Sequence, residues 1–516
     1  MHNMKRNLIF LLGLFIFQNM EAQGVQDAVR FSQDNLNGTA RFRAMSGAFG
    51  ALGGDLSSIN VNPAGSAVFM NNQLGFTLNN TSLKNQSNYF GTNASERENN
   101  FDLNQAGAVF VYKNYNNDSP WKKFSFTINY ENLNNYRNAT FYQGNNTNSV
   151  ANYFIANANG VPLELLETVQ GETVNDLYIY LAGLPDFQYP NVGGFQAQQA
   201  LLGYQTFLIN PVDNTLTNTN YNSNAAGGPY LQQNYAVNSG NSGKVTFNFA
   251  SQYEDWLYLG MNLNSHFVEY RSSSNFYESA GSLLDSGVTR VRFDNDLRTF
   301  GNGFSMNFGA IGKFDDFRVG IAYETPTWYR LVDQLAQSIA TTCADCQEGQ
   351  STFIVNPLII NEYPSYRINT PGKWTGSLAY VFGTNGLLSA DFAIKDYRNT
   401  SFRPRDSYFN PINNQLSDLL VMAAEIRVGG EYKIKRFSLR GGYRYEQSPY
   451  ENGRTVGDLT GFSGGLGYNF GNTKLDLAYS YFQRDYDLQA FNVGLTDAAR
   501  IKNTQNTVTM SLLFDL

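Results

Sequence analysis

From about residue 72 to its end, the chain alternates apolar and polar residues with a period of two. Phe124, Phe126 and Ile128, for example, are separated by Ser125 and Thr127. Because successive side chains of a β-strand point to opposite faces, this pattern predicts strands with one apolar and one polar face. Fourteen such segments can be counted, beginning near Gln73, Phe101, Phe124, Lys244, Trp256, Phe300, Phe317, Pro364, Leu387, Met422, Phe437, Gly461, Thr473 and Thr504.

The lengths of the connections distinguish a membrane barrel from a soluble sandwich. The short connections are 114–120, 254–255, 315–316, 384–385, 435–436 and 471–472. The long ones, which lie between them, are 84–100, 143–240, 271–298, 331–361, 399–420, 447–459 and 487–503. Short turns at one end and long loops at the other are typical of outer-membrane barrels, whereas a sandwich gives no reason for such sorting. We therefore expect an all-β, 14-stranded antiparallel transmembrane β-barrel over residues 72–516.

The start of the chain is expected to be a signal peptide, residues 1–22. Lys5 and Arg6 precede an apolar run from Leu8 to Phe17, and the expected cleavage follows Ala22. The chain has a net charge of -7. An acidic exported protein is a poor candidate for nucleic-acid binding. After the first residues, no apolar stretch is long enough for a membrane-spanning helix.

Charged residues occupy alternate positions of the later strands, opposite the apolar face. If the apolar face meets lipid, these side chains face the lumen, where opposite charges can pair. They are Arg318, Glu324, Asp391, Lys395, Glu425, Arg427, Glu431, Arg440, Arg444 and Glu446. Two interpretations stay open: a charge ladder that only stabilises the wall, and a direct role in the passage of solute.

Cysteine and histidine are scarce. Cys343 and Cys346 form a CxxC motif in a stretch that resembles a loop, and in an exported chain this predicts a short local disulfide. Free or metal-bound thiols are the alternative. His2 lies in the expected signal peptide, so a histidine-dependent enzyme would have to use His266. The polar face of the fifth strand is the expected place of His266, which favours a hydrogen-bonding role. We expect no enzymatic activity, no cofactor and no metal.

Residues 23–71 lack the strand pattern and are rich in glycine, alanine and serine. Small residues permit tight turns and close packing, as a plug inside a narrow lumen would require. The segment ends in Asn62-Pro63-Ala64-Gly65, where the Asn62 side chain can bond to nearby backbone and Pro63 disfavours helix at Asn62. Taken alone, these four residues are an ordinary turn.

In context, this segment resembles the N-terminal hatch of the FadL/TodX-type outer-membrane transport family. The matching positions are Gly47, Ala48, Ala51, Gly54, Asp55, Asn62, Pro63, Ala64 and Gly65. The stretches 437–449, 462–470 and 475–482 also resemble that family's closing strands. The resemblance implies a plugged barrel in the outer membrane of a Gram-negative bacterium, with Gly47, Gly54, Asp55 and residues 62–65 in the hatch.

The resemblance also implies a function. Family members take up hydrophobic small molecules, such as long-chain fatty acids or aromatic hydrocarbons, by passive diffusion past the hatch. The ligand leaves laterally into the membrane lipid, through a gap caused by a kink in the third strand. The polar stretch from Glu131 to Tyr136 interrupts the alternation of the third strand and is the expected place of that kink.

The insertion at 143–240 is too long for a passive connection. We expect an extracellular lobe with helices at 162–169 and 195–207. A second hypothesis rests on this lobe and on the CxxC motif as docking surfaces. It describes a FadL-like barrel that serves as a binding or scaffold subunit in an outer-membrane secretion or assembly complex, with other outer-membrane proteins as partners.

Overall fold

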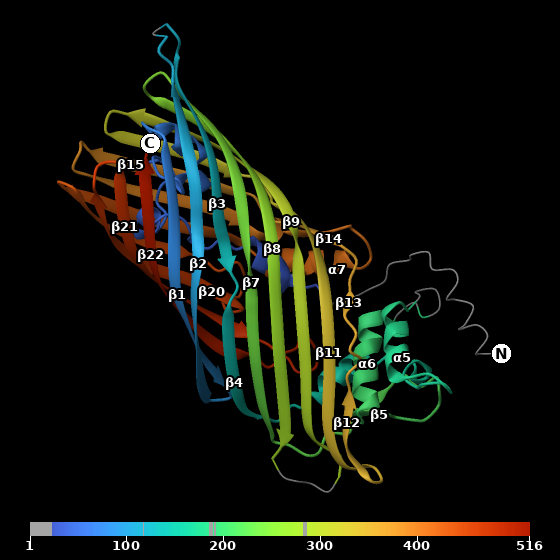
Figure 1. The fold of residues 1–516 in the computed structure, drawn as a ribbon. Coiled ribbons are helices and arrows are strands. Elements are labelled where there is room, and N and C mark those ends of the chain that lie inside the picture. Colours follow the sequence, from blue (N-terminus) through green and yellow to red (C-terminus); the bar gives the residue numbers. More distant parts are fainter. Residues whose placement is uncertain (1–22, 117, 185–188, 190–191, 282–285) are drawn as a thin grey trace.

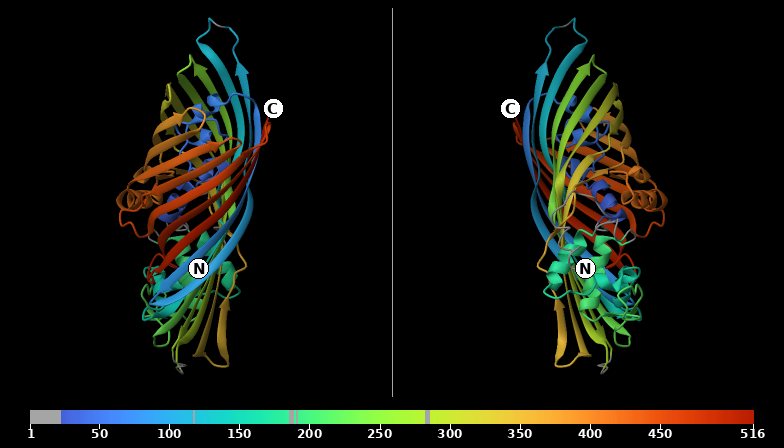
Figure 2. Two further views of the ribbon diagram at one scale, coloured as in Figure 1. Left: turned by 90° about the vertical axis from the view of Figure 1, so that its left-hand side faces the viewer. Right: turned by 90° about the vertical axis from the view of Figure 1, so that its right-hand side faces the viewer.

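The computed structural model describes residues 23–516, apart from 117, 185–188, 190–191 and 282–285. The expected signal peptide therefore lies outside the described residues. The chain forms a closed 14-stranded antiparallel β-barrel (Figures 1 and 2), as the alternation predicts. Its wall consists of β1 (Gln73–Tyr89), β2 (Thr92–Lys113), β3 (Trp121–Asn135), β7 (Tyr230–Tyr253), β8 (Leu257–Ala280), β9 (Val288–Phe314), β10 (Phe317–Glu324), β15 (Lys373–Phe382), β16 (Gly386–Asp396), β18 (Met422–Ile434), β19 (Phe437–Glu446), β20 (Val456–Asn469), β21 (Thr473–Leu488) and β22 (Ala499–Asp515).

The two ends of the strand region close the barrel. β1 pairs with β22 from Gln73 opposite Asp515 to Asn88 opposite Arg500. Five of the wall's connections are tight hairpins at the predicted short turns, for example between β9 and β10 and between β18 and β19. Closure between the first and last strands removes the free edges that an open sheet would expose, as a membrane barrel requires.

Several strands continue past the wall in further segments. β4 (Asn138–Asn146) extends β3 along β7, and β11 (Trp328–Gln347) extends β10 along β9. β12 (Gln350–Val355), β13 (Asn361–Glu362) and β14 (Tyr366–Asn369) lie along β11, and β17 (Ser401–Arg403) pairs with β14.

The predicted long loops at 84–100, 271–298 and 331–361 are wrong. β1 and β2 are joined only by Phe90 and Gly91, and most of the other two stretches is strand. Strands outside the membrane meet water on their outer face, so the apolar residues that mark alternation disappear while the backbone ladder continues. The period-two signal therefore ends before the strands do.

The outer face of the wall is apolar. On neighbouring strands Ile321, Leu378 and Phe392 are about half exposed, as are Phe462 and Tyr479 further round the barrel. A band of exposed apolar side chains on a closed barrel is stable only against lipid. The chain is therefore a multi-pass outer-membrane protein.

Within the described ranges, no helix is both long and apolar enough to cross a membrane.

The insertion between β4 and β7 is a helical lobe. It contains α4 (Ala151–Ala158), η4 (Leu163–Leu165), α5 (Val174–Ala182), α6 (Gly194–Gln205), β5 (Ile209–Pro211) and β6 (Tyr221–Ser223). The lobe lies at the end of the barrel away from the short turns (Figure 1). Phe154 of α4 packs on Phe293 of β9, with ring centroids 5.2 Å apart. The helix expected at 195–207 corresponds to α6, whereas 162–169 forms only the short turn η4.

The N-terminal segment, residues 23–71, runs inside the barrel (Figure 2). Its elements are α2 (Val25–Ser32), α3 (Ala40–Ala44), η2 (Ser58–Asn60) and η3 (Pro63–Val68). One more loop carries helices: η5 (Tyr397–Asn399) and α7 (Phe409–Leu419) connect β16 to β18.

Candidate translocation site

Asn62 fixes the end of the N-terminal segment to the wall. Its side chain is fully buried. Nδ2 donates to the carbonyl of Gly50 at 2.8 Å and to that of Ala310 on β9 at 3.0 Å. Oδ1 accepts from the amide of Ala64 at 3.1 Å and so caps η3, which begins at Pro63. One amide therefore joins two parts of the segment to the wall, which is more than an ordinary turn requires.

The other predicted hatch residues shape the segment itself. Asp55 accepts hydrogen bonds from Thr39 Oγ1 at 2.8 Å and from the Ser57 amide at 2.9 Å. Burial raises the pKa of the Asp55 carboxyl. Gly47 and Gly54 have φ angles of 79° and 65°, in the left-handed region that favours glycine. Gly54 N–H donates to the Gly65 carbonyl at 3.0 Å.

Glycines of the wall provide the seat for this segment, and the sequence analysis missed them. A Cβ at Gly309 would overlap the Asn62 side chain, and one at Gly320 would overlap the Gly50 carbonyl. Gly260, Gly429 and Gly442 make similarly close approaches to the backbone of the segment. Glycine on the lumen face of a strand marks close approach of another backbone, so the signal was present in the sequence.

Gly320→Ala is expected to displace the N-terminal segment and to open the barrel to small polar dyes in proteoliposomes. A methyl group at Gly320 meets backbone that cannot rotate away, and overpacking of this kind costs about 1–3 kcal/mol. Gly376→Ala on the adjacent β15 is the matched control, since nothing lies within 4 Å of its Cβ position. Equal dye entry for both variants would contradict the idea that Gly320 leaves the space that the N-terminal segment needs against the wall.

The lumen charges pair with one another and with the N-terminal segment. Glu431 bonds Arg41 of α3 at 2.8 Å and Arg440 at 2.6 Å, and Arg440 reaches Asp476 at 2.5 Å. These ion pairs therefore connect the N-terminal segment to the wall as well as neighbouring wall strands to one another.

Four more of the predicted lumen charges form a second cluster around Glu425. Glu425 pairs with Arg427 at 2.6 Å and with Arg444 at 2.8 Å, and Arg444 also reaches Glu446 at 3.1 Å. All four side chains are buried. Buried charges are tolerated when each is paired, and these four side chains pair with one another.

Asp34, just after α2, is held by two lysines of the wall. Its Oδ2 lies 2.9 Å from Lys395 Nζ and 3.0 Å from Lys373 Nζ. Burial alone would raise the pKa of this carboxyl, but the attraction of the two ammonium groups outweighs it and holds the pKa well below the usual range. Asp34 is therefore an anionic latch between the N-terminal segment and the wall.

The wall has a break in its ladder where the third strand was expected to kink. β3 pairs with β2 only as far as Glu131, opposite Gln105. Beyond Glu131, β3 and β4 follow β7 alone (Figure 1), and Leu133 is an extra residue in the β3–β7 register, a β-bulge. The part of β2 from Thr92 onward that passes this point pairs only with β1.

Side chains, not backbone, cross this break. From β1, on the far side of β2, Asn85 Nδ2 donates to the Ala139 carbonyl of β4 at 2.7 Å, and Ser87 Oγ donates to the Phe141 carbonyl of β4 at 2.6 Å. Asn100 Nδ2 donates to the Arg137 carbonyl at 3.1 Å. Side-chain hydrogen bonds can be exchanged one at a time, so this seam opens more easily than a continuous ladder.

A cavity of about 540 Å³ lies between the N-terminal segment and this break. It is lined by α2, by Arg43, and by residues of β1, β2, β3, β4, β7, β8, β20, β21 and β22, among them the carboxylates Asp102 and Asp487. Asn100, Asn132 and Asn234 line it, and less than a tenth of each is exposed. The Oδ1 atom of each has no hydrogen-bond partner within the described part of the chain. The cavity thus presents free hydrogen-bond acceptors, which can bind water or a ligand that carries hydrogen-bond donors.

Arg43 is the most deeply buried of the arginines that line this cavity, which also include Arg30, Arg137 and Arg484. Its exposed fraction is 1%. It donates to the Leu36 carbonyl and to Ser480 Oγ, the latter at 2.9 Å, whereas Nε has no hydrogen-bond partner among residues that the structure describes. Burial lowers the pKa of Arg43 to about 10. A buried guanidinium of this kind favours an anionic ligand.

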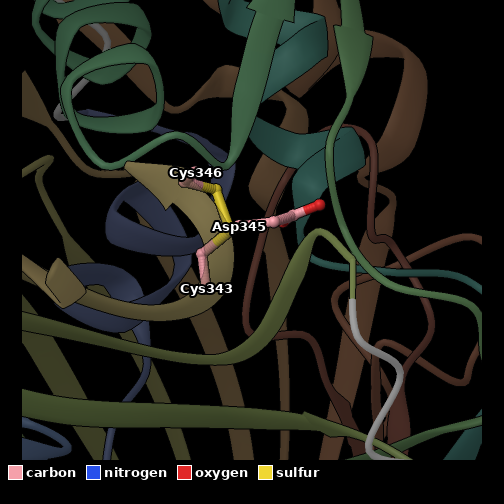
Figure 3. Close-up of side chains that lie close together, drawn as sticks. All are labelled: Cys343, Asp345 and Cys346. Carbon is pink, nitrogen blue, oxygen red and sulfur yellow. A yellow bond between two sulfur atoms is a disulfide. The ribbon is translucent and has the colours of Figure 1, made fainter. Parts of the chain in front are cut away.

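The two cysteines lie in strand β11, although a loop was expected. Cys343 and Cys346 form a disulfide, with Asp345 beside it (Figure 3). With both sulfurs joined, neither is available as a thiolate ligand. Cys343 is buried in the core of the helical lobe, and Asn224 Nδ2 lies 3.3 Å from Cys346 Sγ. The bridge therefore lies where the lobe meets the strand extensions.

His266 has a structural environment. Its Nε2 lies 2.9 Å from Ser305 Oγ, and its Nδ1 lies 3.4 Å from the hydroxyl of Tyr329. The side chain is buried in the lumen, on the face where the alternation places it. Both ring nitrogens of His266 therefore lie within hydrogen-bonding distance of a hydroxyl group.

Solved structures show the same architecture. A FadL homologue from Pseudomonas aeruginosa is 13% identical, with a TM-score of 0.53 over 93% of this chain and 99% of that one. The chain has the FadL-type fold. Below a TM-score of 0.5, the toluene transporters TodX of Pseudomonas putida (0.49, 13% identical, 93% and 99% coverage) and TbuX of Ralstonia pickettii (0.46, 14% identical, 93% and 99% coverage) also align. No family model matches the sequence, and no curated protein matches it. The FadL-type fold is thus shared at a sequence identity too low to transfer a substrate.

Proposed function

We propose that this barrel passes hydrophobic small molecules across the outer membrane by passive diffusion, with lateral exit through the break between β2 and β4. The observation that carries the proposal is the missing ladder beside the 540 Å³ cavity. A molecule in the cavity is separated from lipid by replaceable side-chain contacts. Transfer of apolar surface into the bilayer contributes about 25 cal/mol per Å², so no reaction is needed. No enzymatic step is proposed.

The cavity favours one cargo class over the other. An aromatic hydrocarbon has no group that can pair with Arg43. A long-chain fatty acid has a carboxylate that Arg43 can pair with, while its acyl chain extends into the break. We propose long-chain fatty acids and similar anionic amphiphiles as the cargo.

Arg43→Met is expected to lower uptake of a long-chain fatty acid by about tenfold, the equivalent of roughly 1.4 kcal/mol. Uptake of an uncharged hydrocarbon of equal length is expected to be unchanged. Both are measured as accumulation of labelled solute in cells that express the variant, with Arg436→Met in an exposed turn as the control. A parallel loss of both solutes would show that Arg43 acts only on structure.

The N-terminal segment is proposed to act as a hatch that moves when cargo arrives. It is attached to the wall through polar contacts, including Asp34 with Lys373 and Lys395 and Arg41 with Glu431. The Asp34 side chain is partly exposed, so its ion pairs exchange for water at modest cost, whereas the pair of Arg41 with Glu431 is largely buried and is costlier to break. The hatch therefore has contacts that hold it at rest and still allow motion.

Asp34→Asn is expected to raise the resting conductance of the barrel in planar bilayers at neutral pH. The depressed pKa of Asp34 means that the latch is fully formed above the usual value of 3.8 and is lost only as pH falls well below it. The contribution of Asp34 to the closed state should therefore be constant from neutral pH down to about 4 and be lost only at lower pH, so the difference in conductance between Asp34→Asn and the wild type should persist over that range. A variant with wild-type conductance at pH 7 would contradict the latch.

The scaffold hypothesis stays a prediction. Extraction in mild detergent followed by mass spectrometry separates it from transport. A stable partner at near-equal amounts supports the scaffold, and a lone barrel that still takes up fatty acid opposes it.

A further inference from the structure

Three arginines stand side by side on the outer face of the barrel. In the strand register Arg330 of β11 lies opposite Arg367 of β14, and Arg367 lies opposite Arg403 of β17. Their inward neighbours, such as Tyr329 and Ile368, are buried, so the three guanidinium groups belong to the outward face. Like charges at directly opposed positions destabilise a sheet. The row therefore has an energetic cost that some counter-charge must offset.

The protein supplies little counter-charge. Arg330 donates to Ser365 Oγ at 3.1 Å, and its partner on β9 is Asn302, which is neutral. Over the described residues, Arg367, Arg403 and the nearby Arg405 form no ion pair within 4.0 Å. This is a local positive patch on a chain whose net charge is -7.

Carboxylates near the row are occupied elsewhere. Asp396 pairs with Arg398 at 2.8 Å, and Asp406 accepts from the amide of Phe409 at 2.8 Å at the start of α7. Further along the strands, Glu269 pairs with Arg298 at 2.8 Å. Glu362 accepts from Gln334 Nε2 at 2.7 Å. None of these carboxylates lies in the register row of the three arginines.

The row lies at the level of the outer membrane surface. Trp328, two residues before Arg330, is 43% exposed and stacks beside Phe304, with ring centroids 6.4 Å apart. Below it the outward face is apolar, with Val319 and Ile321 exposed. Exposed Trp at the edge of an apolar band marks the boundary between acyl chains and headgroups. The arginines begin on the side of Trp328 away from the short turns, which is the outer leaflet.

A hollow accompanies the row. A groove of about 540 Å³ lies along it, lined by Trp328, Arg330, Arg367, Asn369, Arg403 and Arg405. A second hollow of about 700 Å³, between the wall and α7, shares Trp328, Arg403 and Arg405 with it and adds asparagines of α7. Arginine binds phosphate through two parallel hydrogen bonds, and its planar group stacks on aromatic rings. The groove thus offers cations and amides to a headgroup whose chains lie along the apolar wall.

We propose that Arg330, Arg367 and Arg403 bind the phosphate groups of a phosphorylated lipid headgroup in the outer leaflet. The lipid is structural: it neutralises the row and covers the wall near α7. This site is separate from the lumen, and it stands or fails independently of the proposed transport function.

The test is native mass spectrometry of the mature chain in micelles that contain diphosphorylated lipid A. The variant replaces the row together, as Arg330→Gln, Arg367→Gln and Arg403→Gln. Its lipid affinity is expected to fall by about tenfold or more. Arg271→Gln, Arg290→Gln and Arg454→Gln, on exposed arginines elsewhere, form the matched control and should bind lipid A like the wild type. Heat-modifiable gel mobility confirms that both variants are folded.

Two further arms identify the ligand. Lipid A without its phosphates should bind the wild type weakly, and inorganic pyrophosphate should compete poorly. Arg367→Lys, which keeps the charge and loses the planar fork, should have intermediate affinity. Wild-type affinity in the triple variant, or equal binding of the phosphate-free lipid, would overturn the proposal. Pyrophosphate binding as tight as lipid A would show a soluble anion as the ligand and would also overturn it.

Discussion

Deletion of Leu133 is expected to reduce uptake of long-chain fatty acids by about tenfold or more, while the barrel stays folded. Leu133 is the unpaired residue between Asn132, opposite Gly243, and Asn134, opposite Ser242. Without it, β3 continues into β4 in one register along β7. A β-bulge bends its strand and ends pairing, so its removal allows β4 to pair with β2 and close the wall. Uptake is measured with a radiolabelled fatty acid in whole cells.

Deletion of Lys122 is the matched control. The same strand has a second register shift at its other end, between Trp121 and Lys123. Deletion there removes one bulge residue from β3 without affecting the break. Its uptake should equal that of the wild type, and fatty acid uptake that survives deletion of Leu133 would exclude the break as the exit.

Asn62→Leu is expected to produce the largest leak among single substitutions in the N-terminal segment. The change removes two donor bonds, to Gly50 and Ala310, and the cap of η3. Each buried polar group left unsatisfied costs about 1–3 kcal/mol, and the isosteric leucine cannot replace the bonds. The hatch should therefore detach from β9, while the barrel keeps its own ladder.

The leak is measured as single-channel conductance and as entry of a large polar antibiotic. Asn114→Leu serves as the control, because Asn114 lies in an exposed turn and bonds only locally, to the Trp121 carbonyl at 2.8 Å. Conductance of Asn62→Leu equal to that of the control would mean that Asn62 does not anchor the hatch.

The alternation predicted the barrel because it reports which face meets lipid. It identified the short turns and the lumen position of His266, since both follow from a period of two. It failed beyond the membrane, where β1, β2 and β9 continue with polar residues on their water-facing side. In these parts of the three strands the amino-acid composition resembles that of a loop, although the backbone forms strand pairs.

The candidate site was predictable only in part. Glu131 to Tyr136 stood out as a polar interruption, and the structure places the ladder break there. The seat of the hatch depends on which lumen glycine opposes which backbone atom, and that follows from register between segments far apart in sequence. The same holds for Arg43, whose lack of a carboxylate partner is a property of the folded lumen. Contacts between segments that are far apart in the sequence cannot be predicted from the local sequence of either segment.

The central claim is that cargo occupies the cavity beside the wall break. A cryo-EM structure of the mature barrel with a long-chain fatty acid brominated at its terminal carbon tests it directly. We expect carboxylate density next to Arg43 and bromine density between β2 and β4. Bromine density along the barrel axis, past the N-terminal segment toward the short turns, would contradict lateral exit.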